Sequence, residues 1–143
     1  MPSETNPPPR GRGRPRRVDA DEQILDAALA MLRSGGYRAL SLDEVARRAG
    51  TAKSSIYRRW PSKAALAAEI VRRETTSEPS DGESAARAFD ALLNGAFGGV
   101  VASLIGEAQE SAETRAIVIE LLAPYRDAGE GALGAILFRR LLT

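Results

Sequence analysis

The stretch from Thr51 to Lys63, TAKSSIYRRWPSK, concentrates hydroxyl groups, a phenol and cations. Lys53 and Lys63 are the only lysines in a chain that otherwise uses arginine. Cations pair with phosphate oxygens, hydroxyl and phenol groups donate hydrogen bonds to them, and Arg58 can also pair bidentately with guanine. These residue types therefore predict a segment that binds DNA.

Other chemistry is poorly supported. The sequence has no cysteine and no histidine, which excludes disulfides, thiol nucleophiles, Ser-His-Asp triads and ordinary zinc sites. It also lacks carboxylate pairs at a recognisable catalytic spacing and a glycine loop that would cradle phosphate. We therefore expect no enzyme activity, no cofactor and no metal site.

Charge is divided unevenly along the chain. Residues 1–73 carry 15 Lys/Arg against 8 Asp/Glu, whereas residues 74–143 carry 5 against 11. This asymmetry indicates that the basic half binds a polyanion and that the acidic half has a different function. No run of about 18 apolar residues and no apolar signal region are present, so we expect a cytoplasmic protein that does not contact a membrane.

Residues 1–18 are expected to form a disordered basic arm, because MPSETNPPPRGRGRPRR is almost free of apolar side chains. Its RGRGRPRR run resembles an AT-hook core, in which Arg12, Arg14 and Arg16 would lie in a narrow minor groove. The alternative is a polycation that raises affinity for any DNA through counterion release.

Four helices are predicted in residues 19–74. Asp19 and Glu22 resemble a capping box at the start of the first helix, and Gly35-Gly36 ends it. Ser41 caps a short second helix, and Gly50 permits the tight turn into a third helix over residues 52–59. Ser62 caps the fourth.

The pattern of residues 41–60, a short helix, a glycine turn and a second short helix, predicts a helix-turn-helix. Such a unit places its second helix in the major groove. The residues expected to face DNA are Ser41, Thr51, Lys53, Ser54, Ser55, Tyr57, Arg58 and Lys63. The alternative is that the arginines of this region, at positions 47, 48, 58 and 59, only form a solvated helix face.

The segment SLDEVARRAGTAKSSIYRRWPSKAALAAEIV resembles the helix-turn-helix of the TetR family of transcriptional regulators. The likeness begins in ILDAALAMLRSGGYRALSL, covers about half the chain, and rests on Gly50, Lys53, Ile56, Tyr57 and the WPSK corner. It implies that Tyr37 packs beside the reading unit. Ala52 departs from the family, in which a capping serine is frequent at this position, and Thr51 is the substitute cap we expect.

The resemblance is weaker after the linker at residues 75–82. GEAQESAETRAIVIELLAPYRD is similar to the middle of the regulatory domain of one TetR subgroup, which implies a helical ligand-binding and dimerisation domain over residues 83–143. Gly98-Gly99 and Gly106 are expected helix breaks, and a later apolar seam is expected to end near Pro124 or Gly129. The candidate effector contacts are Phe89, Leu93, Phe97, Val101, Leu121 and Tyr125, and the alternative is that these are ordinary core residues.

The family usually dimerises through two C-terminal helices, whereas a single short segment, residues 132–142, stands in that place here, so this domain looks shortened. We expect an all-α repressor that binds a pseudo-palindromic operator in double-stranded DNA as a homodimer and is released by an unknown small apolar effector. The alternatives are an architectural, non-inducible DNA-binding protein, or a truncated regulator with impaired dimerisation.

Overall fold

The computed structural model describes residues 17–75 and 82–128. All but the last two residues of the predicted arm, most of the linker and the segment 132–142 lie outside these ranges. The helices are α1 Arg17–Ala39, α2 Leu42–Ala49, α3 Lys53–Arg59, α4 Lys63–Glu74, α5 Gly82–Asn94, α6 Gly98–Ala108 and α7 Ala112–Ala128. No strand occurs in the described residues, and the all-α prediction is confirmed.

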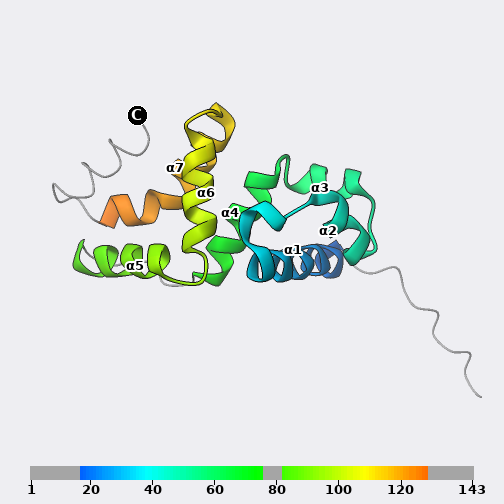
Figure 1. The fold of residues 1–143 in the computed structure, drawn as a ribbon, viewed down its shortest axis with the longest axis horizontal. Helices are drawn as coiled ribbons and strands as arrows, with labels where there is room; N and C mark the ends of the chain where they lie inside the picture. The colour runs from blue at the N-terminus through cyan, green and yellow to red at the C-terminus, as the bar shows by residue number, and fades with distance from the viewer. Residues whose placement is uncertain (1–16, 76–81, 129–143) are drawn as a thin grey trace, which may run out of the picture.

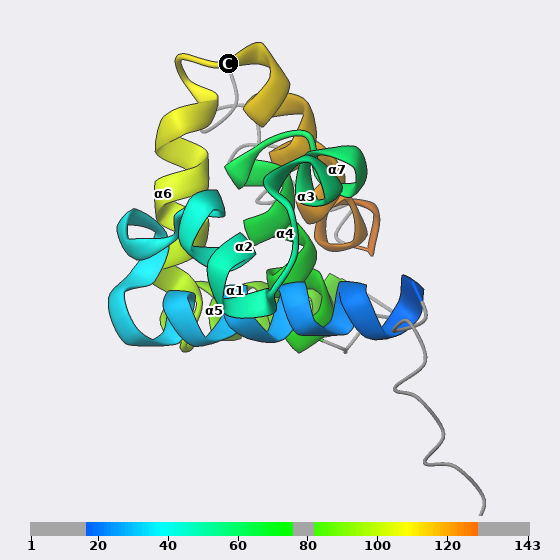
Figure 2. The same cartoon turned by 90° about the vertical axis from the view of Figure 1, so that its right-hand side faces the viewer.

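Helices α1 to α3 lie at one side of the molecule and α5 to α7 at the other, with α4 between them (Figure 1). Seen from the α1–α4 side, α1 runs across the base and α2, α3 and α4 stand above it (Figure 2). Helix α4 packs against α1, α6 and α7, and α6 also contacts α1. The two groups of helices therefore touch through α1 and α4.

The first helix departs from its predicted ends. It begins at Arg17, so Asp19 lies in its first turn, where a carboxylate faces the positive end of the helix dipole, and does not cap it. The predicted stop is seen as a sharp kink, because Gly36 has φ 70° and ψ −165°. This left-handed φ suits glycine, and it redirects the turn that carries Tyr37.

The helix-turn-helix forms as its caps predict. The Ser41 side chain accepts a hydrogen bond from the Glu44 backbone N–H, and the Ser62 side chain accepts one from the Ala65 N–H at 3.1 Å. Gly50 closes α2 at φ 64°. The expectation that Thr51 caps α3 is wrong: Ala52 holds the cap position without a side-chain bond. The Thr51 N–H instead donates to the Ala46 carbonyl at 3.0 Å and completes the end of α2.

After the linker, the expected break at Gly106 is wrong, and so is Pro124 as the end of the last seam, since α7 runs to Ala128. The break lies at Gly95–Phe97, and Gly98-Gly99 begin α6, but Gly106 lies inside α6 and Pro124 inside α7. A glycine within a helix costs only about 1 kcal/mol and a proline about 3. Burial of Leu121 and Leu122 in the last turns of α7 offsets this cost.

One core cluster holds both groups of helices. It includes Ile56 and Leu66 from α3 and α4, and Leu104 and Leu122 from α6 and α7, each no more than 2% exposed. Full burial of such a side chain contributes about 1.5–3 kcal/mol. The orientation of the helix-turn-helix relative to α6 and α7 is thus fixed by shared apolar packing.

Among the described helices, no single one is long and apolar enough to cross a membrane. Helices α5 and α6 reach that length and composition only as a pair, and they meet at a 93° bend.

Candidate nucleic-acid interface

Helix α3 has one buried and several exposed positions. Ile56 is fully buried and anchors the helix to the core, whereas Lys53, Ser54 and Arg58 are exposed and Tyr57 is 44% exposed. Ile56 is the one buried residue of this seven-residue helix, and the polar side chains of the helix are half-buried or exposed. The arrangement presents donors along the solvent side of the second helix of the helix-turn-helix.

Part of the predicted set gathers around one groove of about 460 Å³, which we call the cation groove. Ser41, Lys53, Tyr57 and Lys63 line it. Its remaining lining residues are Tyr37, Leu40, Leu42, Asp43, Pro61, Ser62, Ala64 and Glu107. Thr51, Ser54, Ser55 and Arg58 do not line it, so the predicted DNA-facing residues divide into groove and non-groove groups.

Lys53 is already engaged in the groove. Its ammonium lies 2.8 Å from an Asp43 carboxylate oxygen and 5.6 Å from the centre of the Tyr57 ring. The hydrogen bond to Asp43 raises the pKa of Lys53, and the negative charge of Asp43 adds to this effect. The side chain therefore stays cationic, and a phosphate must compete with Asp43 for it.

Lys63 has an aromatic partner and, in the described part of the chain, no carboxylate partner. It is the first residue of α4, and its ammonium lies 4.4 Å from the centre of the Tyr37 ring. Such a cation–π contact orients the ammonium without neutralising it. A phosphate can therefore approach the Lys63 ammonium without displacing a carboxylate of the described residues.

Tyr37 is buried under Lys63, and its hydroxyl donates a 2.6 Å hydrogen bond to the carboxylate of Glu107 in α6. Burial raises the pKa of Tyr37 well above its ordinary value, and the bond to Glu107 and the charge of Glu107 act in the same direction. The phenol is therefore neutral and remains a donor at any physiological pH.

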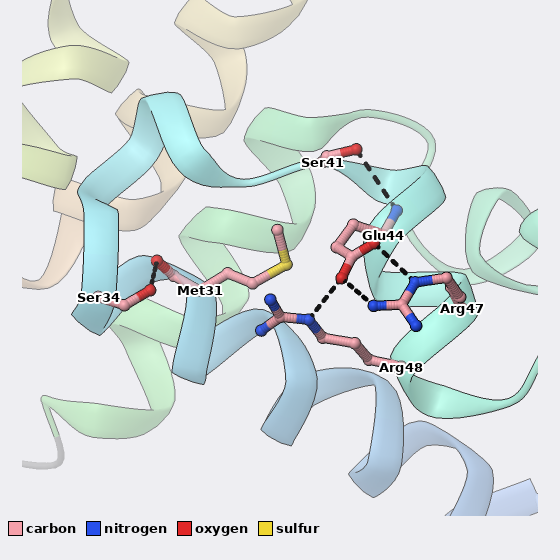
Figure 3. A network of polar contacts seen from close by, with 6 residues as sticks. All are labelled: Met31, Ser34, Ser41, Glu44, Arg47 and Arg48. Atoms are coloured by element: carbon pink, nitrogen blue, oxygen red, sulfur yellow. Dashed lines mark hydrogen bonds and ion pairs between the residues drawn. The ribbon is translucent and has the colours of Figure 1, made fainter.

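Most arginines of the region are paired within the protein. Glu44 accepts from Arg47 at 2.9 Å and from Arg48 at 2.8 Å, and these bonds lower its pKa to about 2 (Figure 3). Arg59 pairs with Asp21 of α1. In residues 17–75 and 82–128, Arg58 has no ion pair. The solvated-face interpretation thus suits Arg47, Arg48 and Arg59 better than Arg58.

Among the charged residues of the groove, sequence reasoning missed Asp43 and Glu107. An acidic residue on α2 facing a lysine on α3 is a signal that helical spacing could have supplied for Asp43. Glu107 is 70 positions from Tyr37, and only the packing of α6 against α1 brings the two together. No local pattern announces that contact.

The six apolar effector candidates do not surround a described groove. Phe97, Val101 and Leu121 are at most 8% exposed, whereas Leu93 is 38% exposed. Phe89 and Tyr125 are half-buried, with ring centres 5.9 Å apart. None of the six lines the cation groove or the two other grooves, one between α4 and α7 and one between α1 and α4. Their role in effector binding remains a prediction.

A short helix, a left-handed glycine turn and a second helix with outward cations define a helix-turn-helix module. Residues 24–70 match the family of bacterial regulatory proteins described as the tetR family. The helix-turn-helix of this chain is thus of the tetR type, and the resemblance predicted from the WPSK corner is confirmed.

Characterised and uncharacterised regulators are similar to this chain. The uncharacterised HTH-type transcriptional regulator YdeS of Bacillus subtilis (strain 168) is 33% identical over 107 residues, which cover 68% of this chain and 54% of YdeS. The HTH-type transcriptional repressor KstR of Rhodococcus jostii (strain RHA1) is 40% identical over 63 residues, 44% of this chain and 30% of KstR. The chain thus spans about half the length of YdeS.

Proposed function

We propose that the chain is a DNA-binding regulator of transcription and not an enzyme. The convergence of Ser41, Lys53, Tyr57 and Lys63 on one groove beside α3 carries this proposal. The family match over residues 24–70 and the similarity to named transcriptional regulators support it.

In this function α3 enters the major groove, which is about 12 Å wide and accepts one helix. The cation groove grips the adjoining phosphates: Lys53 and Lys63 supply charge, and Ser41 and Tyr57 supply hydroxyl donors. Thr51, Ser54, Ser55 and Arg58 lie outside the groove and are left for base edges. Arg58 is the strongest candidate for base reading, because it has no ion pair in the described residues.

The finer parts of the proposal concern assembly and control. Residues 19–74 form the DNA-binding domain and residues 83–143 a ligand-binding and dimerisation domain. A homodimer places two α3 helices on the half-sites of a pseudo-palindromic operator, and Arg12, Arg14 and Arg16 of the arm reach the minor groove. Repression is the mode favoured by the similarity to KstR, a repressor. A small apolar effector releases the operator by binding the DNA-free state more tightly.

Selection from a pool of random duplexes with the purified full chain tests the function. Recovery of a single pseudo-palindromic site supports a dimeric, sequence-specific regulator. Equal recovery of all sequences supports the architectural alternative, and no recovery contradicts DNA binding altogether.

Lys63→Ala tests the cation groove. We expect uniformly weaker binding to all duplexes and a salt dependence flatter by about one unit of slope. Arg87→Ala is the matched control, since Arg87 is an exposed cation on α5, paired with Glu83 and outside the groove. Equal effects of the two substitutions would show that only net charge matters.

A further inference from the structure

The cation groove is built by both groups of helices. In the described part of the chain, Glu107 of α6 is the one lining residue that does not come from the helix-turn-helix or its neighbours α1 and α4. Its carboxylate accepts a hydrogen bond from the Tyr37 hydroxyl, and the Lys63 ammonium lies over the ring of the same tyrosine. A carboxylate on a phosphate-binding groove repels phosphate. Its presence here suggests that it serves another purpose, so its contacts are informative.

Both carboxylate oxygens of Glu107 are used. One accepts the 2.6 Å bond from the Tyr37 hydroxyl, and the other accepts a 2.8 Å bond from the hydroxyl of Thr114. Thr114 is 3% exposed, and its backbone N–H donates to the Ser111 side chain at 3.1 Å in the first turn of α7. Glu107 is therefore held from two directions, and its position depends on the corner between α6 and α7.

Tyr37 transmits that position to the groove. Its ring is buried and carries the Lys63 ammonium at 4.4 Å from the ring centre, while its hydroxyl is fixed by Glu107. Tyr37 comes directly after the kink at Gly36. The part of α1 before the kink therefore does not by itself determine the position of the Tyr37 ring. The Tyr37 side chain therefore joins Glu107 to Lys63 through one hydrogen bond and one cation–π contact.

We propose that Glu107 is a positioning residue for DNA binding: through the Tyr37 ring it sets where the Lys63 ammonium lies on the cation groove. The proposal rests on the proposed function for its consequence, since Lys63 must meet a phosphate for the link to affect affinity. It makes the α6–α7 corner part of the DNA-binding apparatus, although no residue of that corner needs to touch DNA.

The first test needs no DNA. Amine acylation followed by mass spectrometry reads the reactivity of both lysines, and Lys53, held by Asp43, is the internal control. Tyr37→Phe keeps the ring and removes the bond to Glu107. We expect the acylation rate of Lys63 to rise about two- to fivefold relative to that of Lys53. An unchanged ratio in folded Tyr37→Phe protein overturns the link, whether or not the chain binds DNA.

The second test measures affinity for a selected duplex. Tyr37→Phe should weaken binding about three- to tenfold, and the loss should vanish in a Lys63→Ala background but persist in an Arg58→Ala background. An equal loss in both backgrounds indicates a merely structural role and overturns the proposal. If Lys63→Ala binds DNA like the parent, the proposed function of Lys63 fails while the acylation result stands.

Conservative variants keep the test valid if one substitution disturbs folding. Glu107→Gln retains an acceptor for Thr114 and offers an N–H donor to Tyr37, so the Lys63 acylation ratio should stay near that of the parent. Glu107→Ala removes both bonds and should match Tyr37→Phe. Thr114→Val removes one bond and should give a smaller rise. Equal ratios in all three variants contradict positioning by Glu107.

Discussion

The helix-turn-helix and the helices α5 to α7 share one core but differ in where their most informative residues lie. Around α2 to α4, polar side chains stand at helix ends and meet in a groove with two lysines. In α5 to α7, the residues with the strongest sequence signal are apolar, and most are buried or half-buried. The comparison teaches that a local pattern of caps and cations builds a binding surface, whereas an apolar pattern identifies a core without distinguishing a ligand cavity within it.

The largest effects should come from breaking the shared core. Leu66→Ala in α4 and Leu104→Ala in α6 each remove a fully buried side chain. We expect each to lower the free energy of unfolding by about 2–5 kcal/mol. Because one cluster spans both groups of helices, thermal unfolding followed by circular dichroism should show a single transition that both variants shift. A second transition that only one variant moves would show that the two groups unfold independently.

The next effect separates base reading from phosphate binding within the helix-turn-helix. Arg58→Ala should cost about 1–3 kcal/mol on a preferred duplex and much less on a random one, if Arg58 reads a guanine. Lys63→Ala should cost the same on both. Affinities measured by fluorescence anisotropy on the two duplexes check this contrast, and equal ratios for the two variants would remove the assignment of Arg58 to a base.

Helix caps offer a smaller and more selective comparison. Ser41 caps α2 and lines the groove, whereas Ser111 accepts from the Thr114 N–H at α7. Replacement of either by alanine should cost about 1 kcal/mol of stability. Ser41→Ala should also weaken DNA binding, because it removes a phosphate donor. If Ser41→Ala lowers the melting temperature and leaves affinity unchanged, Ser41 acts only as a cap.

The smallest effect concerns pH. Hydrogen bonds from Arg47 and Arg48 lower the pKa of Glu44 from 4.5 to about 2. A carboxylate with a depressed pKa stabilises the folded state above its unfolded pKa and loses this contribution as the pH falls through its folded pKa. Glu44 should therefore support α2 at pH 5 and above, with the contribution fading between about pH 4.5 and 2. A carboxyl titration by NMR with a midpoint near 4.5 would contradict this.

Much of the fold near the groove could be predicted from the sequence, because local chemistry determines it. Ser41, Gly50 and Ser62 each act within one helical turn, and each was placed correctly. Thr51 failed as a cap because α3 begins at Lys53, so that Ala52 holds the cap position and Thr51 lies one residue outside it. Of the two expected ends of the last seam, Pro124 was wrong, since α7 continues through it to Ala128.

The candidate site was predictable only in part for the same reason. Residue types pointed to Lys53, Tyr57 and Lys63, which the fold brings to one groove. Their partners Asp43 and Glu107 depend on how helices pack, and Glu107 on a contact across 70 positions. Sequence patterns thus identified the lysines of the groove. Their partners, Asp43 for Lys53 and Tyr37 for Lys63, are set by how the helices pack.

Because the chain has only two lysines, amine labelling in the presence of DNA tests the central claim directly. The selected duplex is added at saturation, the protein is acylated briefly, and Lys53 and Lys63 are quantified by mass spectrometry, with a high-salt sample as the dissociated control. The account predicts that DNA protects both lysines and that high salt restores their reactivity. Two lysines that react as fast with bound DNA as without it would show that the cation groove does not face the duplex.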